Sequence, residues 1–256
     1  VFAKTDAGPD GIAVDALGNV YTANSRANTV TKVTASGKAS RLGPTGKTPR
    51  GIAVDSSGNV YTSNLGDNTV TKITPGGSSS VLGTTGSKPI DVAVDAAGNV
   101  YTTNYADSTV TKITPGGVSS VHAATGSRPL GITLDRQGNV YTANEGANNV
   151  TKITPGGAAS TLGKTGSWPQ AIAIDRSGNI YTANWNSRNV SKITPKGSSA
   201  IYGKTGRRPI GIAVDPHGAV FTTNDGANSV SKINRRGRSK DIASTGRRPI
   251  GIASDA

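Results

Sequence analysis

The sequence predicts an all-β fold, a six-bladed β-propeller of four-stranded antiparallel blades. The first observation is a repeat of 40 residues that begins at positions 11, 51, 91, 131, 171 and 211 without slippage. The second is that each repeat holds short runs of β-branched and apolar residues between turns rich in Gly, Pro and Asn. The third is that no segment shows helical periodicity. Several short strands in a unit of about 40 residues are typical of propellers, because one unit cannot bury its own faces.

The first repeat shows how each blade is expected to begin. Residues 11–15 (GIAVD) are apolar, with small residues at alternate positions, and predict the innermost strand. Asp15 then opens a turn in which its carboxylate accepts backbone hydrogen bonds and Gly18 takes a positive φ.

Three further strands complete the predicted blade. Residues 19–24 (NVYTAN) predict the second strand and residues 25–28 a polar loop. The β-branched residues 29–34 predict the third strand. Residues 38–43 predict a weak outer strand, after which a T-G-x-x-P link leads to the next repeat.

The repeats account for 240 of the 256 residues, and 16 remain at the two ends. Residues 1–10 and 251–256 supply an outer-strand piece and an inner strand for a second time. We therefore predict one propeller domain over residues 1–256, with both terminal segments at the closure of the ring. Six blades are predicted rather than seven, because a seventh would lack its two middle strands.

The charge of the chain favours an anionic partner. There are 28 Lys and Arg against 15 Asp and Glu, a formal net charge of +13. Such a surplus suits an anionic ligand, a glycan, an acidic protein, a nucleic acid or a membrane surface, with general solubility as the alternative. The chain has no cysteine, which excludes disulfides and thiolate metal ligands.

No apolar run is long enough for a transmembrane helix. Val1 is expected to be a processed terminus rather than a translation start. We expect a monomer that is secreted, periplasmic or held at the cell surface.

Several stretches of the repeat resemble known propeller families. The pattern PxGIAVDxxGNVY followed by NxVxKI resembles the NHL-type repeat, and NxVxKITxxG is similar to the streptogramin B (virginiamycin B) lyases and their relatives. YTANxxxNTV resembles the YVTN-type repeats of surface propellers. The resemblance covers essentially residues 1–256 and implies the propeller fold. It does not decide function, because these families include sensors, lyases and nucleic-acid binders.

The resemblance to the lyases implies a slot for reactive histidines between the link proline and the inner strand. The slot residues here are Asp10, Arg50, Ile90, Leu130, Gln170, Ile210 and Ile250. None is His, which weakens the lyase interpretation. Asp10 and Arg50 could orient a ligand or simply form an ion pair with each other.

The candidate binding site lies on what we call the top face, formed by the outer-to-inner links and the loops between second and third strands. Lys and Arg concentrate in these links, and two Trp lie among the loops. Basic side chains with exposed aromatics suit an anionic or carbohydrate ligand, and a solvated rim is the alternative. The candidate ligand-binding residues are Arg50, Trp168, Trp185, Arg207, Arg208, Arg247 and Arg248.

Recurring residues are interpreted as scaffold. The Asp15 series should cap turns, the Tyr21 series should fill the space between blades, and the Lys32 series should cover a neighbouring blade with its stem. A second basic group, residues 235–240 (RRGRSK), lies on the opposite, bottom face. It could dock an acidic partner, although a solvated turn is the favoured interpretation.

No catalytic residue, metal site or cofactor is predicted. The chain has only two histidines, His122 and His217, which are too far apart in the repeat for a triad or a metal cluster. The favoured function is a non-catalytic ligand- or protein-binding propeller, such as a sensor or surface module. A streptogramin lyase-like enzyme is one alternative. A nucleic-acid-binding propeller is another, which rests on charge because no base-reading motif is present.

Overall fold

The computed structural model describes residues 3–254, which divide into two compact units, residues 3–122 (unit 1) and 123–254 (unit 2). Six four-stranded antiparallel sheets form, and no helix occurs among the described residues. The fold is therefore the predicted six-bladed β-propeller of four-stranded antiparallel blades. Within the described part of the chain, no helix is long and apolar enough to cross a membrane.

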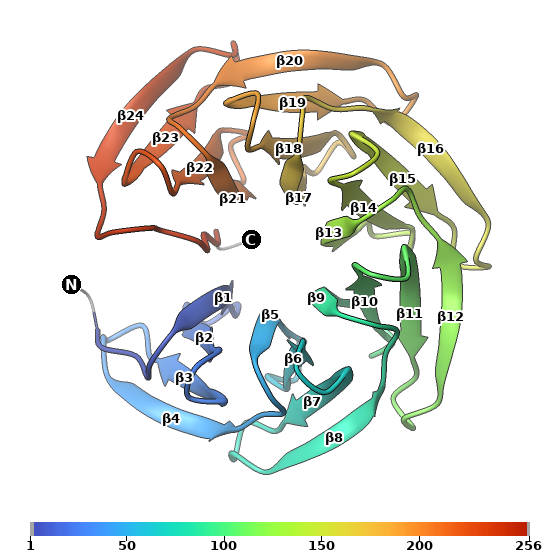
Figure 1. Cartoon of the computed structure of the whole chain (residues 1–256). Coiled ribbons are helices and arrows are strands. Elements are labelled where there is room, and N and C mark those ends of the chain that lie inside the picture. The colour runs from blue at the N-terminus through green and yellow to red at the C-terminus, as the bar shows by residue number, and fades with distance from the viewer. Residues whose placement is uncertain (1–2, 255–256) are drawn as a thin grey trace. The chain divides into compact units, whose positions relative to one another are not determined.

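Unit 1 contains three sheets, and the boundary between the units falls within the last strand of the third (Figure 1). The strands are β1 (Pro9–Val14), β2 (Val20–Asn24), β3 (Thr29–Val33), β4 (Ala39–Pro44), β5 (Pro49–Val54), β6 (Val60–Asn64), β7 (Thr69–Ile73), β8 (Ser79–Thr84), β9 (Pro89–Val94), β10 (Val100–Asn104), β11 (Thr109–Ile113) and β12 (Ser119–Ala124).

Unit 2 repeats the arrangement in three further sheets. The strands are β13 (Pro129–Leu134), β14 (Val140–Asn144), β15 (Asn149–Ile153), β16 (Ala159–Lys164), β17 (Pro169–Ile174), β18 (Ile180–Asn184), β19 (Asn189–Ile193), β20 (Ser199–Lys204), β21 (Pro209–Val214), β22 (Val220–Asn224), β23 (Ser229–Ile233) and β24 (Ser239–Ser244).

The strands of each sheet pair in chain order, and the register of the middle pair is the same in every sheet. The first strand begins at the link proline, two residues before the predicted start. Pro49 pairs with Asn64, and the ladder shifts before Ile52. Alternation of apolar and polar residues does not predict the start of this strand, because the alternating pattern begins only after the irregularity.

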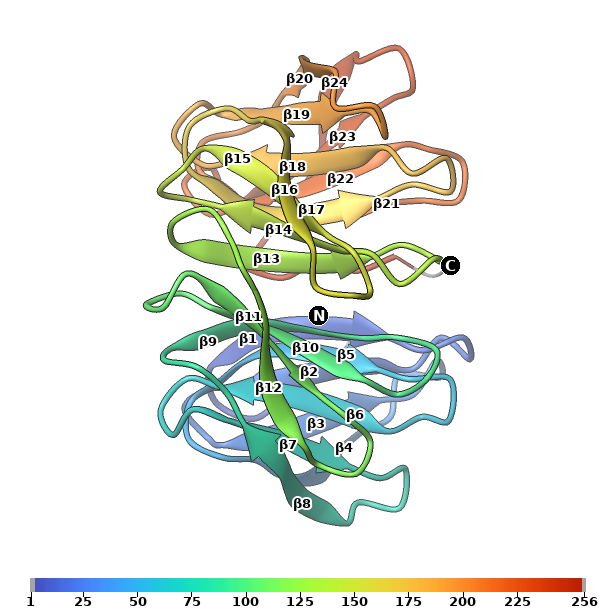
Figure 2. The same ribbon diagram turned by 90° about the vertical axis from the view of Figure 1, so that its right-hand side faces the viewer.

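Neighbouring sheets of a unit lie side by side (Figure 2), and a small apolar core is buried between them. In unit 1, Tyr21 and Val30 of one sheet pack against Ile52 and Ile73 of the next. In unit 2, Tyr181 and its sheet pack in the same way against the sheet that follows. The predicted role of the tyrosine series in packing between blades is confirmed for these copies.

The turn after each first strand is fixed by its aspartate. The Asp55 Oδ1 accepts the backbone N–H of Ser57 and Asn59, both at 2.9 Å. The Oδ2 accepts Asn59 Nδ2 and the Tyr61 hydroxyl, again both at 2.9 Å. Gly58 has a φ of 78°. The predicted turn is confirmed, and the link from the carboxylate to the tyrosine is an addition to it.

The lysine series lies over the tyrosines of its own sheets. Lys72 is the cross-strand partner of Tyr61, and its Nζ lies 5.8 Å from the centroid of that ring. Such a cation–π contact is favourable because the ring face is electronegative. The lysine therefore belongs to the scaffold, but it packs on the tyrosine of its own sheet and not on a neighbouring blade as predicted.

Candidate functional site

Buried asparagines hold the top loops in place. The Asn64 Oδ1 accepts the Thr62 hydroxyl, and its Nδ2 donates to the hydroxyls of Thr69 and Thr71. The Thr71 hydroxyl also accepts the backbone N–H of Gly46 in the link. One side chain thus ties two strands together, and a shared threonine ties both to the link.

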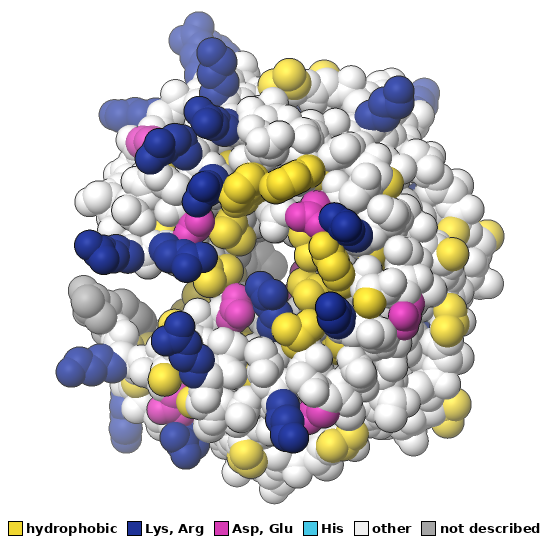
Figure 3. Space-filling view, in the orientation of Figure 1, with side chains coloured by type: hydrophobic (Ala, Val, Ile, Leu, Met, Phe, Trp, Pro, Cys, Tyr) yellow, Lys and Arg dark blue, Asp and Glu magenta, His cyan; other side chains and the backbone are white. Residues whose placement is uncertain are grey.

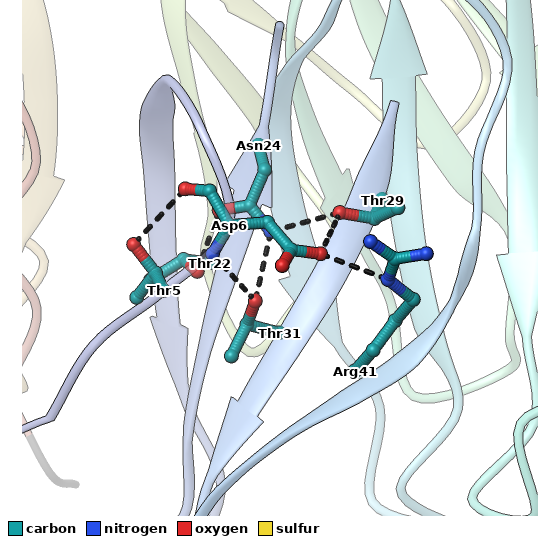
Figure 4. Close-up of polar contacts among 7 residues, drawn as sticks. All are labelled: Thr5, Asp6, Thr22, Asn24, Thr29, Thr31 and Arg41. Atoms are coloured by element: carbon teal, nitrogen blue, oxygen red, sulfur yellow. Dashed lines mark hydrogen bonds and ion pairs between the residues drawn. The ribbon is translucent and has the colours of Figure 1, made fainter. Parts of the chain in front are cut away.

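The first sheet carries an aspartate, Asp6, where the later links have glycine (Figure 4). Its Oδ2 accepts the Thr29 hydroxyl at 2.7 Å and pairs with Arg41 Nε at 2.9 Å. The hydrogen bond from Thr29, followed by the one from Arg41, holds the pKa of Asp6 below its ordinary value. The cluster ties the link of this sheet to its third and outer strands through one carboxylate oxygen.

Within each sheet, the link and the loop between second and third strands lie on the same face, as predicted. The backbone N–H of Leu65 donates to the Thr48 carbonyl at 3.1 Å, and that of Gly66 donates to Lys47 at 2.9 Å. Thr48 precedes the link proline and has a φ of 53°, in the left-handed region. The five later sheets therefore present two neighbouring side chains, one from each segment, on a fixed frame, whereas the first sheet has Gly8 at the link position.

In unit 2 these paired positions hold the residues expected to bind a ligand. The Trp185 N–H donates to the Trp168 carbonyl, and the Asp225 N–H donates to that of Arg208, both at 2.9 Å. Trp168 and Arg208 have φ values of 58° and 57°. The sheet β17–β20 thus presents a Trp pair and the sheet β21–β24 an Arg–Asp pair.

The two tryptophans stack on each other. Their ring centroids lie 5.2 Å apart with an interplanar angle of 24°. Trp168 is 46% exposed. Across the gap to the next sheet, the Arg208 guanidinium lies 4.9 Å from the Trp185 ring centroid. The result is a rigid aromatic pair with a cation over one of its rings.

The neighbouring arginines surround a hollow of about 220 Å³. It is lined by Arg188, Arg207, Arg208 and Gly226. Arg207 Nη2 donates to the Gly226 carbonyl at 3.1 Å, which fixes its direction. Figure 3 shows Lys and Arg side chains gathered over β21–β24, with hydrophobic side chains over the neighbouring sheet.

Arg248 differs from its neighbours because it is paired. Its Nε lies 3.1 Å from Oδ1 of Asp225, whose side chain is almost fully buried. Arg247 is exposed. The carboxylate of Asp225 therefore offsets one charge of the cluster and leaves Arg207, Arg208 and Arg247 as its outward-facing cations.

Arg50 lies in unit 1, where it forms the ion pair with Asp10 that the sequence offered as one option. Arg50 Nε lies 3.4 Å from Asp10 Oδ2. Burial raises the pKa of Asp10, and the nearby Arg50 charge partly opposes this rise. The structure therefore places six of the seven candidate residues in unit 2 and gives Arg50 a local partner.

Sequence reasoning had not singled out Arg188, Asp225 or the contact between Gln170 and Glu145. Gln170 Nε2 lies 3.3 Å from Glu145 Oε1, which links the slot of one sheet to the top loop of the sheet before it. A constant spacing in sequence separates each link residue from the loop residue beside it. This spacing could have identified such pairs, but it is recognised only once the hydrogen bonds between link and loop are known.

Neither histidine lies in a top loop. His122 belongs to β12, with its ring edge-on to Tyr101 at 5.3 Å, and His217 lies in the turn before β22. Among residues 3–254 no group of three His, Cys, Asp or Glu is placed to hold a metal ion.

The model of the virginiamycin B lyase family matches residues 41–256. A search of curated proteins returned no match.

Solved structures share the fold at low identity. Virginiamycin B lyase from Staphylococcus aureus is 18% identical with a TM-score of 0.84, over 98% of this chain and 90% of that one. A catalytically inactive histidine-to-alanine form of that lyase with quinupristin is 20% identical with a TM-score of 0.85, over 96% and 88%. A chain of a nidogen/laminin complex is 17% identical with a TM-score of 0.72, over 88% and 94%.

Proposed function

Since the chain belongs to the virginiamycin B lyase family, we propose that it is a ligand-binding propeller of this family. The ligand is anionic or a carbohydrate, and it binds the top loops of unit 2. The observation that carries the proposal is the Trp168–Trp185 stack with Arg208 over the Trp185 ring. This is a preorganised aromatic and cationic surface rather than a scatter of charges.

Three features of the scaffold support a binding role. The left-handed φ of Trp168 and Arg208 is shared by the equivalent residues of other links, such as Thr48 and Lys88, so the frame that presents the two side chains is built into the repeat. The Trp168 N–H donates to Asn148 Oδ1 at 2.8 Å, and the Trp168 carbonyl accepts the Trp185 N–H at 2.9 Å, which holds this residue in place. The hollow beside Arg207 and Arg208 leaves room for an anionic group next to the rings.

Intrinsic fluorescence gives a direct test, because Trp168 and Trp185 are the only tryptophans in the chain. We expect a heparin-derived tetrasaccharide to change this fluorescence saturably. Replacing Arg207 and Arg208 together with Ser should weaken its binding at least about tenfold, since hydrogen bonds to charged groups are among the stronger ones. Arg136→Ser, an exposed arginine of a bottom turn, is the control and should bind as the wild type does.

The salt dependence of the affinity distinguishes binding at a formed site from binding through the overall positive charge of the protein. Binding through few charge contacts should weaken moderately as salt rises, whereas the nucleic-acid alternative requires the steep dependence of many phosphate contacts. A single-stranded oligonucleotide that binds more tightly than the tetrasaccharide would favour that alternative. Unchanged binding in the double Ser variant would overturn the site.

A second candidate is a lyase acting on a streptogramin, which family membership favours. The inactive form of the related lyase lacks a histidine, and neither histidine of this chain lies in a top loop. Incubation with quinupristin followed by mass spectrometry tests this candidate. Conversion faster than in buffer alone would replace the binding proposal with an enzymatic one.

A further inference from the structure

The bottom ends of the last two sheets depart together from the repeat. Ala219 and Phe221 stand where the other five repeats have Asn and Tyr. Arg235 stands where four repeats have Pro, and Tyr202 stands at an outer-strand position that is Leu in three repeats. All four departures lie within unit 2, on the face opposite to the Trp pair.

Two of these departures, Ala219 and Phe221, remove side-chain hydrogen-bond donors from the turn aspartate Asp215. In the turn of β17–β18, Asp175 accepts four hydrogen bonds, from the N–H groups of Ser177 and Asn179, from Asn179 Nδ2 and from the Tyr181 hydroxyl. In the next sheet Asp215 keeps only the bond from the Ala219 N–H, at 2.8 Å. Among residues 3–254, no hydrogen bond to its second oxygen is formed.

The other two departures, Arg235 and Tyr202, line the same pocket as this carboxylate. Arg235 lies along the turn that Asp215 opens, and its Nε donates to the His217 carbonyl. The Tyr202 hydroxyl donates to the Asn234 carbonyl of the neighbouring sheet at 3.0 Å. Both bonds fix side chains that the repeat itself does not supply.

An open pocket of about 410 Å³ lies between these groups. Small-molecule sites have volumes of about 300–1,000 Å³. The charged and aromatic side chains that line it include Asp175, Arg176, Lys192, Tyr202, Asp215 and Arg235. Lys192 Nζ lies 5.6 Å from the centroids of both the Tyr181 and Tyr202 rings. Three cationic side chains thus line the pocket together with two carboxylates, Asp175 and Asp215. Asp175 already accepts four hydrogen bonds within its own turn.

The hydrogen-bonding and charged groups that line this pocket indicate the chemistry of its ligand. Asp215 can accept hydroxyl hydrogens, and such bonds to an ionised carboxylate are strong. Arg235 and Lys192 can hold an anionic group, and the tyrosine rings offer an apolar surface. We propose that this pocket binds an acidic sugar, with a hydroxyl group on Asp215 and a carboxylate on Arg235 and Lys192.

Calorimetric titration with D-glucuronate tests the proposal, and D-glucose and acetate serve as probes with only one of the two functional groups. Glucuronate should bind, and each of the other two should bind at least about tenfold more weakly. The decisive variant restores the repeat residues with Ala219→Asn and Phe221→Tyr, which should occupy Asp215 and weaken glucuronate binding to the same extent. Because it rebuilds a turn that the other sheets already have, its thermal unfolding should stay at or above that of the wild type.

Arg235→Pro, which also restores a repeat residue, should likewise weaken glucuronate binding at least about tenfold. The matched control is Arg236→Ser, which removes one exposed charge from the same turn without touching the pocket. Equal losses in Arg235→Pro and Arg236→Ser would reduce the site to diffuse charge. No binding of glucuronate, or undiminished binding after Ala219→Asn with Phe221→Tyr, would overturn it. Because the site shares no residue with the Trp pair, neither result bears on the proposed function of the top loops.

Discussion

Each turn aspartate balances burial against hydrogen bonds. Burial raises the pKa of Asp135, but hydrogen bonds from Asn139, Tyr141 and the Gln137 N–H outweigh it and leave the pKa below its ordinary value. A carboxyl group with a lowered folded-state pKa stabilises the fold above its unfolded-state pKa. That contribution is lost as the pH falls through the folded-state value.

Replacing Tyr141 with Phe should therefore destabilise the protein by about 1 kcal/mol at neutral pH, because it removes one donor to a charged acceptor. Urea unfolding of the variant and the wild type measures the difference. The difference should shrink below the ordinary pKa of 3.8, where Asp135 becomes protonated. A difference that persists unchanged in acid would assign the effect to packing of the ring instead.

The sequence identified both tryptophans as top-loop aromatics but could not predict that they stack. Trp168 and Trp185 meet because one precedes the link proline and the other opens the next loop of the same sheet. The pairing of Arg248 with Asp225 was hidden for a similar reason, since the two lie 23 residues apart and meet only through the packing of loops. Asp215 was interpreted as a turn cap like its equivalents, and only its hydrogen bonds reveal the difference.

At the scale of elements, the hairpin between third and outer strands rests on one glycine. Gly77 has a φ of 89°, and a Cβ at this position would lie 2.6 Å from the Leu42 carbonyl oxygen of the preceding sheet. Its neighbour Gly76 has only the Thr74 hydroxyl near such a Cβ, at 3.9 Å. The turn therefore tolerates a side chain at one position and not at the next.

Gly77→Ala is expected to lower the free energy of unfolding by about 1–3 kcal/mol, since it adds backbone strain to a clash with backbone. Gly76→Ala is the matched control and should be neutral or slightly stabilising. Thermal unfolding of the two variants side by side measures both. Equal stability of the two would show that the hairpin moves to accept the new methyl group.

The order and the type of the strands could be predicted from the sequence. The exact residues at which some strands begin and end could not. The middle strands were predicted to within a residue because β-branched residues alternate along them. The first strand was shifted because its ladder is irregular near the proline. The outer strand, observed at Ala39–Pro44, is one residue later than predicted, because it is mostly exposed and carries little hydrophobic pattern.

For the whole molecule, the repeated tyrosines set the alkaline limit of stability. Burial, followed by the hydrogen bond to Asp15, raises the pKa of Tyr21 to about 12. Burial and the charge of Asp95 raise that of Tyr101 to about 12 as well. The ordinary value is 10.0, so these tyrosines stabilise the fold fully below pH 10.

We expect stability to decline steeply between pH 10 and about 12, as the unfolded chain loses phenolic protons that the folded chain retains. Circular dichroism should report unfolding in the same pH range in which phenolate absorbance rises. Phenolate absorbance that rises near pH 10 while the sheet signal stays intact would contradict the assignment.

The common register of the six sheets also bears on how the chain reaches this state. Because Tyr61 meets Lys72 just as Tyr181 meets Lys192, a strand of one repeat can pair with the complementary strand of another at almost no loss of contacts. Similar repeats in one chain favour misassembly of this kind during folding. Refolding from denaturant should therefore pass through mispaired species, and at high protein concentration two chains should exchange strands and lower the yield of correctly folded protein.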